Sequence, residues 1–171
     1  MAEIERVRER ERSPLGDNPY ERIMRQRKEL ADRNLTGPVV VRREDREWFQ
    51  ARQGKLLFYL DPVTFKDTPL QHWRVFLHDI KTRSGKHRHQ GGLVIYVLEG
   101  RGYSIVDGER KDWEKGDLVL LPMKPDGVEH QHFNLDPEKP ALWAAFINIP
   151  IQEYLASDLQ QAENSPDFKE A

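Results

Sequence analysis

The stretch SGKHRHQGGLVIYVLEGRGY, from Ser84 to Tyr103, contains the pattern that decides the fold class. His87 and His89 are separated by one residue, in a run that otherwise reads as β-strand and leads into a Gly-Gly pair. In a strand, side chains two residues apart point to the same face of the sheet. The two imidazoles are therefore predicted to project into one space, as binding of a metal ion requires.

A second pair of the same form, His130 and His132, follows later in the chain. If both predicted strands line one barrel, three or four imidazoles converge inside it. Neutral imidazole suits Fe, Cu, Ni, Mn and Zn, and three nitrogen ligands leave positions open for oxygen and substrate. The remaining histidines, His72 and His78, stand alone in the sequence, and an isolated histidine is more often a surface or core residue than a ligand.

Short β-branched or aromatic runs recur through the rest of the chain, separated by Gly, Pro and Asp-Gly turn signals. The predicted strands are Val39–Arg42, Lys55–Leu60, His72–Ile80, Leu93–Leu98, Gly102–Val106, Lys111–Trp113, Asp117–Leu121, Val128–Phe133 and Ala141–Ile149. The dipeptide Asp107-Gly108 is a strong signal for a two-residue hairpin. Short strands with turns roughly every 8–12 residues favour an all-β sandwich or barrel over a parallel α/β sheet.

Helices are predicted on both sides of this β-rich region. Asn18 as an N-cap, a proline at the first helical position and an acid two residues later predict a helix over Pro19–Asn34. After Pro150, apolar residues at helical spacing predict a short C-terminal helix: Ile151, Tyr154, Leu155 and Leu159.

A single domain is predicted, with polar ends. Residues 1–16 are charged and nearly free of large apolar groups, so we expect a disordered tail. The domain itself is predicted over 17–165, with a core barrel at about 38–150, and 166–171 form a second polar tail.

The composition argues against several classes of partner. Lys plus Arg number 27 and Asp plus Glu 29, a net charge of −2 that disfavours nucleic acid as the main partner. No apolar run reaches the ~18 residues of a membrane span, and no signal-peptide pattern is visible at the N-terminus. The chain has no cysteine, which fits a cytoplasmic protein.

Two motifs, in order, resemble those of the cupin superfamily, usually written G-x5-H-x-H-x3,4-E-x6-G and G-x5-P-x-G-x2-H-x3-N. The residues that match are His87, His89 and Gly100 in the first motif, and Gly116, Pro122, the run Pro125–His130 and Asn134 in the second. This resemblance implies an all-β, cupin-type double-stranded β-helix, or jelly-roll barrel. The N-terminal helix and the short C-terminal helix flank it.

The first motif departs from the cupin pattern at its glutamate, because that position falls on Leu93, or on Gly92 with one residue of slack. With the histidines of both motifs kept, the departure favours a three-histidine ligand set over a lost site. Gentisate 1,2-dioxygenase-like ring-cleaving enzymes have such a set, and the sequence is similar to theirs in three further segments. These segments are Val97–Gly102, Trp113–Asp117 and His130–Asn134.

The similarity to these enzymes implies roles for four histidines. His87, His89 and His130 would hold the metal, and His132 would lie beside bound dioxygen or substrate as the catalytic acid or base. Gln90 has the opposite strand parity to His89, so we expect it to support the loop rather than bind the metal.

The expected substrate differs from gentisate, because the position of the family's carboxylate-binding arginine is occupied here by Ile95. Leu93 and Ile95 predict an apolar pocket, which favours phenolic or β-diketone-like ligands. Arg74, Phe76, His72 and His78 are predicted to share one face of the preceding strand, where Arg74 would supply an alternative anchor.

The expected function is that of a mononuclear non-haem Fe(II)-dependent dioxygenase that cleaves a C–C bond of a chelating small molecule. Mn, Ni, Cu and Zn are alternative metals. A non-oxidative metal-dependent isomerase or lyase is one alternative function, and a small-molecule binding or sensor protein is another. A homodimer or higher homo-oligomer is also expected.

Overall fold

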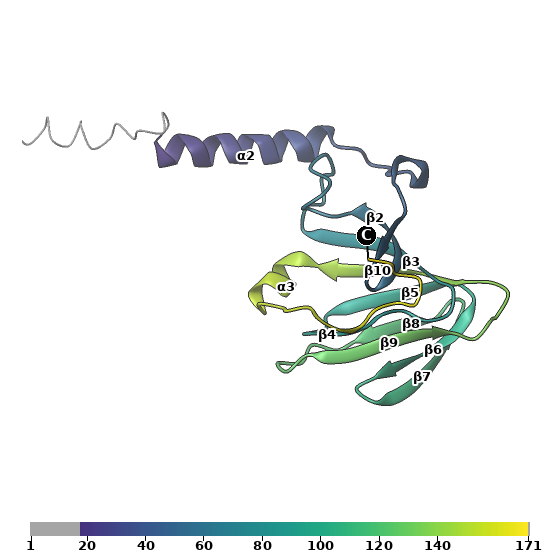
Figure 1. Ribbon diagram of the computed structural model, residues 1–171. Helices are drawn as coiled ribbons and strands as arrows, with labels where there is room; N and C mark the ends of the chain where they lie inside the picture. The colour runs from purple at the N-terminus through teal and green to yellow at the C-terminus, as the bar shows by residue number, and fades with distance from the viewer. Residues whose placement is uncertain (1–17, 171) are drawn as a thin grey trace, which may run out of the picture. The chain divides into compact units, whose positions relative to one another are not determined.

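A computed structural model describes residues 18–170 (Figure 1). The chain divides into two compact units, of which the smaller runs to Val39 and includes Asp67–Pro69. The larger unit comprises Val40–Lys66 and the chain from Leu70 onward. Each unit is described separately below. Among the described residues, no helix is long and apolar enough to cross a membrane.

Helix α2 (Pro19–Thr36) dominates the smaller unit and extends two residues beyond the predicted end. The side chain of Asn18 accepts a hydrogen bond from the backbone N–H of Glu21 at 2.9 Å, which confirms the predicted N-cap. At the other end, the N–H of Gly37 donates to the carbonyl of Arg33 and closes the last turn.

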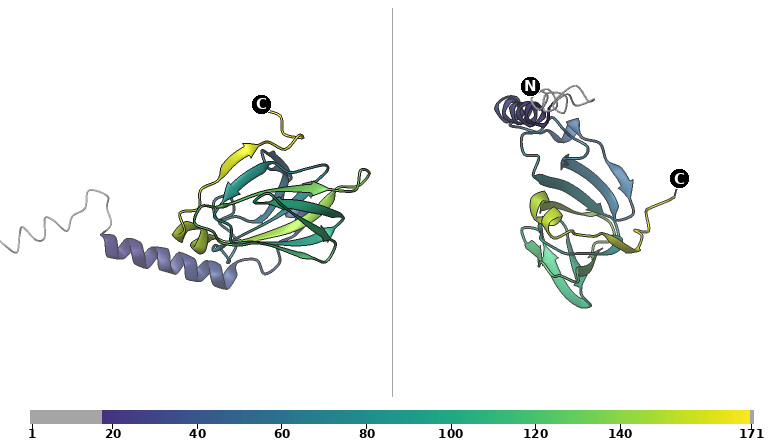
Figure 2. Two further views of the ribbon diagram at one scale, coloured as in Figure 1. Left: turned by 90° about the horizontal axis from the view of Figure 1, so that it is seen from below. Right: turned by 90° about the vertical axis from the view of Figure 1, so that its left-hand side faces the viewer.

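The larger unit consists of two antiparallel sheets with the shared core between them, which confirms the predicted jelly-roll class (Figures 1 and 2). The six-stranded sheet contains, in spatial order, β1 (Phe49–Ala51), β2 (Gly54–Leu60), β3 (Trp73–Ile80), β10 (Ala141–Asn148), β5 (Leu93–Glu99) and β8 (Leu118–Leu121). The five-stranded sheet contains β11 (Gln160–Glu163), β4 (Lys86–His89), β9 (Val128–Asn134), β6 (Arg101–Val106) and β7 (Glu109–Glu114). A short 3-10 helix (Arg43–Asp45) and helix α3 (Ile149–Tyr154) complete the unit.

Strand β5 shows why the sequence folds in this way. Leu93, Ile95 and Val97 alternate with more exposed residues and are each less than 5% exposed. Because side chains alternate with a period of two residues, one face of the strand points toward the core. There Leu93 and Ile95 pack with apolar residues of neighbouring strands, including Val128 from the opposite sheet.

The predicted hairpin is present between β6 and β7. Asp107 and Gly108 both have positive φ, 49° and 85°, as the two-residue turn that joins right-twisted strands requires.

Two sequence predictions of secondary structure are wrong or incomplete, and the strands β1 and β11 are not predicted. Residues Val39–Arg42 form no strand, because this segment pairs with no other strand and Val39 is 96% exposed. The C-terminal helix ends at Tyr154, before the predicted Leu159. The chain then forms β11, a polar edge strand with no apolar alternation by which it could have been recognised.

Gly102 provides a test of the packing of β6 against its two neighbouring strands, β7 and β9. A Cβ atom at this position would lie 2.1 Å from the carbonyl oxygen of Phe133 and 2.3 Å from the Trp113 ring. We therefore expect Gly102→Ala to lower the free energy of unfolding by about 1–3 kcal/mol in urea titrations. Gly108→Asn is the control, because nothing lies within 4 Å of that position and Asn tolerates positive φ. Equal stability of the two variants would contradict this packing.

Candidate metal centre

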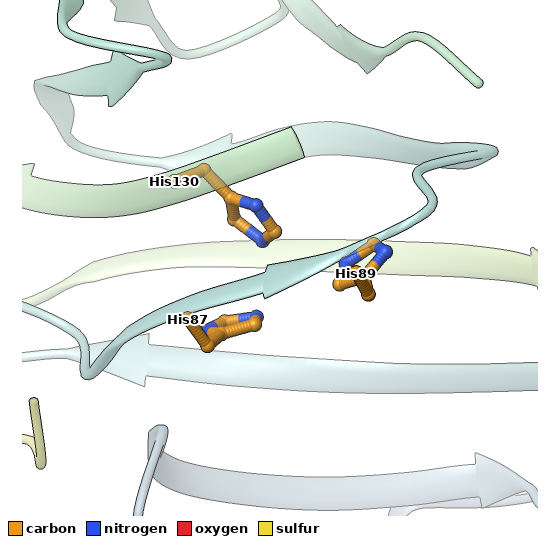
Figure 3. Close-up of side chains that lie close together, drawn as sticks. All are labelled: His87, His89 and His130. Carbon is orange, nitrogen blue, oxygen red and sulfur yellow. The ribbon is translucent and has the colours of Figure 1, made fainter. Parts of the chain in front are cut away.

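Strands β4 and β9 bring three histidine side chains together (Figure 3). His87 and His89 share the inner face of β4, and His130 lies directly opposite His87 in the antiparallel ladder. The ring centroid of His130 is 4.2 Å from that of His87 and 4.8 Å from that of His89. One ring nitrogen from each histidine lies within 4.8 Å of the other two, an arrangement that can hold a metal ion.

The hydrogen bonds of two of these rings leave a lone pair for a metal. Nδ1 of His130 donates to the carbonyl of Val128 at 3.0 Å, and Nδ1 of His87 lies 3.3 Å from the carbonyl of Gly85. Each Nε2 is then unprotonated. In the described chain Nε2 of His130 is buried and has no hydrogen-bond partner, as expected for an atom whose partner is a metal ion.

His89 differs from the other two histidines in its tautomer. Its Nδ1 accepts a hydrogen bond from the backbone N–H of Gly91 at 2.9 Å, so the neutral ring carries its proton on Nε2. Binding a metal through Nε2 would require that this hydrogen bond be given up or that the ring lose this proton.

The three histidines line a cavity of about 260 Å³ between the two sheets. Most of its remaining wall is apolar and comes from Leu56, Phe58, Phe76, Leu93, Trp143, Ile147 and Leu159. Polar groups at the wall include Arg74 and, after α3, Ser157 and Asp158. The concave, largely apolar shape is typical of a small-molecule site.

Three of the four residues predicted to bind substrate line this cavity: Arg74, Phe76 and Leu93. Ile95 has the same strand parity as Leu93, but it lies deeper in the core, is 1% exposed and is not part of the cavity wall. The structure therefore places Ile95 in the packing beneath the site.

Arg74 forms an ion pair with a buried partner. Its Nε lies 2.9 Å from Oδ1 of Asp61, while Thr64 donates from its N–H and its hydroxyl to Oδ2. Burial alone would raise the pKa of Asp61, but the hydrogen bonds from Thr64 and the ion pair with Arg74 lower it overall. The charge of Arg74 is thus already compensated within the protein.

His132, the predicted acid or base, is 2% exposed and lies beside His130 in the cavity wall. Its Nδ1 is 2.6 Å from the hydroxyl of Ser104, which also accepts a hydrogen bond from Nε1 of Trp113 at 2.9 Å. Ser104 is fully buried, so its hydroxyl proton is satisfied only by donation to His132. This places the proton of neutral His132 on Nε2.

Gln90 supports the loop, as expected, and does so by holding the C-terminal segment. Its side-chain oxygen accepts from the N–H of Asp158 at 2.8 Å, and its own N–H donates to the Ser157 hydroxyl at 3.3 Å. These bonds fix the part of the wall that follows α3.

His78 is a cavity residue that the sequence placed on the same strand face as Phe76 but did not assign to the site. It is 2% exposed and lines the cavity from β3, on the same face as Arg74 and Phe76. The available signal was its spacing of two residues from Phe76, whereas exposed His72 lies outside the cavity wall.

The buried histidines predict a stability that depends on pH. Burial, followed by repulsion from neighbouring histidines, lowers the pKa of His78 to about 3 and that of His87 to about 4, from 6.5. Because the folded pKa values lie below the unfolded ones, stability is complete above pH 6.5 and is lost as the pH falls toward the folded values. For the metal-free protein we expect a loss on the order of 4 kcal/mol between pH 7 and pH 5. Urea titrations at both pH values measure it, and unchanged stability would contradict buried, neutral histidines.

Comparison with known proteins finds relatives of part of this barrel. Residues 76–149 match the protein family described as "Cupin domain", which confirms the resemblance found in the two motifs and the cupin-type jelly roll. Gentisate 1,2-dioxygenase from Ralstonia sp is 36% identical over 70 residues, 40% of this chain and 19% of that protein. Acireductone dioxygenase from Rattus norvegicus is 31% identical over 97 residues, 54% of this chain and 50% of that protein.

A solved structure shares the fold over a longer segment. Salicylate 1,2-dioxygenase from Pseudoaminobacter salicylatoxidans, with gentisate, aligns with a TM-score of 0.52 and 25% identity. The alignment covers 78% of this chain and 36% of that one. The matched region thus spans less than a fifth of the gentisate dioxygenase and about a third of the salicylate dioxygenase.

Proposed function

We propose that this protein is a metal-dependent dioxygenase that cleaves a C–C bond of a small phenolic or diketone-like molecule. The observation that carries the proposal is a group of three neutral imidazoles, His87, His89 and His130, in the wall of a largely apolar cavity. The similarity to gentisate and acireductone dioxygenases supports it, because gentisate and acireductones both present oxygen atoms that can chelate a metal.

The metal proposed is Fe(II), with Mn, Ni, Cu and Zn as alternatives. A redox-active ion held by the three histidines would supply binding positions for oxygen atoms and a path for electrons between substrate and dioxygen. The three ligands are neutral, because burial lowers the pKa of each ring. The full positive charge of the ion would therefore favour an anionic, chelating oxygen pair.

His132 and the apolar wall provide the other parts of the proposed mechanism. His132 presents its Nε2 proton, whose position the Ser104 hydroxyl fixes, and can donate it to an oxygen of a reacting ligand. Phe76, Leu93 and Trp143 exclude water from the cavity around His132. This strengthens the hydrogen bond from His132 to the ligand and protects reactive species from hydrolysis.

The cavity is better suited to a substrate without a carboxylate. Arg74 is the cationic side chain among the described residues of the wall, and Asp61 already neutralises its charge. Asp158, also at the wall, would repel a carboxylate of the substrate. The terminal nitrogens of Arg74 can still donate hydrogen bonds to an uncharged oxygen, and this is the substrate-binding role that we propose for it.

We also propose that the protein is cytoplasmic and forms homo-oligomers. The absence of cysteine supports the cytoplasmic location. An exposed apolar patch on the outer face of β5 and β8 supports association of copies. Its residues form two cross-strand pairs, Val94 with Leu120 and Tyr96 with Leu118.

An oxygen-electrode screen tests the proposed activity. Protein loaded anaerobically with Fe(II) is mixed with catechol, substituted phenols without a carboxylate, 2,4-pentanedione and gentisate. We expect oxygen uptake with at least one phenol or diketone, with gentisate a poorer substrate, and none with metal-free protein. Oxygen uptake with none of these compounds would contradict the dioxygenase and favour a non-oxidative isomerase or lyase, or a binding protein.

A further inference from the structure

Val39–Arg42, which we call the valine segment, has the composition of a β-strand but belongs to neither sheet of the described chain. Three successive valines favour extended structure, because their branched side chains fit a pleated sheet. The backbone is already extended at Arg42, with a φ of −86° and a ψ of 148°. Val39 and Val40 are nevertheless 96% and 67% exposed. The segment is therefore an apolar, extended piece of chain that lacks a strand to pair with.

One sheet edge is open in the same way. Strand β8 pairs only with β5, so the backbone groups along its other side have no strand partner among the described residues. The side chains of Leu118 and Leu120 on β8 are 60% and 64% exposed. The other edge strands are protected against pairing, because β1 has three residues, β11 is polar and β7 is charged.

A groove of about 490 Å³ lies between β8 and the hairpin of β6 and β7. It offers apolar contacts to both faces of an added strand. Leu118 and Leu120 lie on the outer face of the sheet, while Val119 and Trp113 belong to the groove wall and pack toward the core. A strand that is buried on both faces has a continuous apolar run instead of alternation. The three valines have this pattern.

Charge favours the same pairing. The groove wall has an excess of two negative charges, from Asp107, Glu109, Asp112 and Asp117 against Lys111 and Lys124. The valine segment ends at Arg42 and is followed by Arg43, and both side chains are exposed. Exposed ion pairs add little affinity, but complementary charges fix the register and direction in which two surfaces meet.

The valine segment cannot reach β8 of its own chain. It precedes β1, and β1 and β8 are the opposite edges of the six-stranded sheet. A strand added beyond β8 lies six strand spacings from β1, about 29 Å across the sheet. The chain from Arg42 to Phe49 spans at most ~25 Å when fully extended, and its 3-10 helix, Arg43–Asp45, shortens it further. The open edge must therefore belong to a second copy.

We propose that the valine segment of each chain adds to β8 of a second copy. A two-fold axis parallel to the strands brings the outer faces of the two six-stranded sheets together and sets β1 of each chain over β8 of the other. Both segments then cross in the same way, and the assembly closes as a dimer. The exposed apolar pairs of β5 and β8 are covered at the same time. This inference rests on the proposed homo-oligomer, to which it gives a specific contact, and is independent of the proposed activity.

Analytical ultracentrifugation of the full chain measures the contribution of the segment. We expect the wild type to be a dimer at micromolar concentration. Val40→Asp should weaken dimerisation at least about tenfold, because it places a further negative charge in an acidic groove. Val63→Asp is the matched control, because Val63 is 74% exposed and lies outside both the segment and the groove. It should leave the dissociation constant unchanged, and both variants should keep the circular dichroism spectrum of the wild type.

Cross-linking between two different variants tests which parts of the two chains meet. The chain has no cysteine, so an introduced cysteine is the one reactive thiol. Val40→Cys and Leu120→Cys are mixed, left to exchange subunits and treated with a short bis-maleimide. We expect mass spectrometry to detect a covalent heterodimer of the two variants. The control mixture of Val63→Cys with Leu120→Cys should give far less of it.

The possible results separate this contact from the homo-oligomer. If the wild type is a dimer that Val40→Asp leaves intact, the valine segment is not the contact, while the homo-oligomer stands. A mixture of Val40→Cys and Leu120→Cys that cross-links no more than the control also overturns the contact. If the wild type is monomeric at every concentration measured, the contact and the homo-oligomer both fail.

Discussion

Replacing His87 by alanine is expected to abolish tight metal binding. His87 supplies one of three nitrogens that lie within 4.8 Å of one another, and within the described chain no carboxylate belongs to this group. Two imidazoles alone make a weak site. Removing a residue that only supports a ligand already costs 10–100-fold in metal affinity, so we expect a loss of more than ~100-fold for a ligand itself. Metal analysis of protein purified without chelators, with competition titrations, measures the change.

His72→Ala is the control for this experiment. His72 is exposed and lies outside the cavity wall, so its removal should leave the metal content unchanged. If wild type and His87→Ala contain equally little metal, or bind it equally well, the three-histidine centre is wrong.

Replacing His132 by phenylalanine should separate catalysis from metal binding. The phenyl ring keeps the packing against Trp143 and His130 but removes the proton that the Ser104 hydroxyl positions. General acid–base catalysis contributes about 10²–10⁴-fold, so kcat for a substrate found in the oxygen screen should fall by roughly that factor. The metal content should remain that of the wild type.

Ser104→Ala is the companion variant, because it frees the His132 ring to adopt either tautomer. We expect a smaller loss of kcat, about tenfold, with unchanged metal content. Loss of metal in His132→Phe would make His132 a ligand, and an unchanged kcat would remove it from the mechanism.

The sequence predicts the pairing of the histidines well because its signal is local. Two residues in one strand share a face regardless of the rest of the fold, so His87 with His89, and His130 with His132, could be paired from spacing alone. The register between β4 and β9 is not local. Nothing in either strand specifies that His87 lies opposite His130, which the whole barrel determines.

Features that join distant parts of the chain could not be predicted. Ile95 lies on the same strand face as Leu93. The depth of Ile95 in the core, however, depends on which strands cover it. The ion pair of Arg74 with Asp61 joins two segments that are separate in the sequence. Arg74 was expected to bind the substrate with a free charge, but Asp61 neutralises that charge. The spacing of His78 from Phe76 indicates only its strand face, and the pairing of β3 with β10 places it beside Trp143.

Anomalous X-ray diffraction from crystals of the Fe(II)-loaded protein tests the central claim most directly. Data collected on both sides of the iron absorption edge locate the ion independently of any assumption about the reaction. We predict one anomalous peak within ~2.2 Å of a ring nitrogen of each of His87, His89 and His130. A peak bound elsewhere, or no peak between these three rings in iron-loaded crystals, would contradict the account.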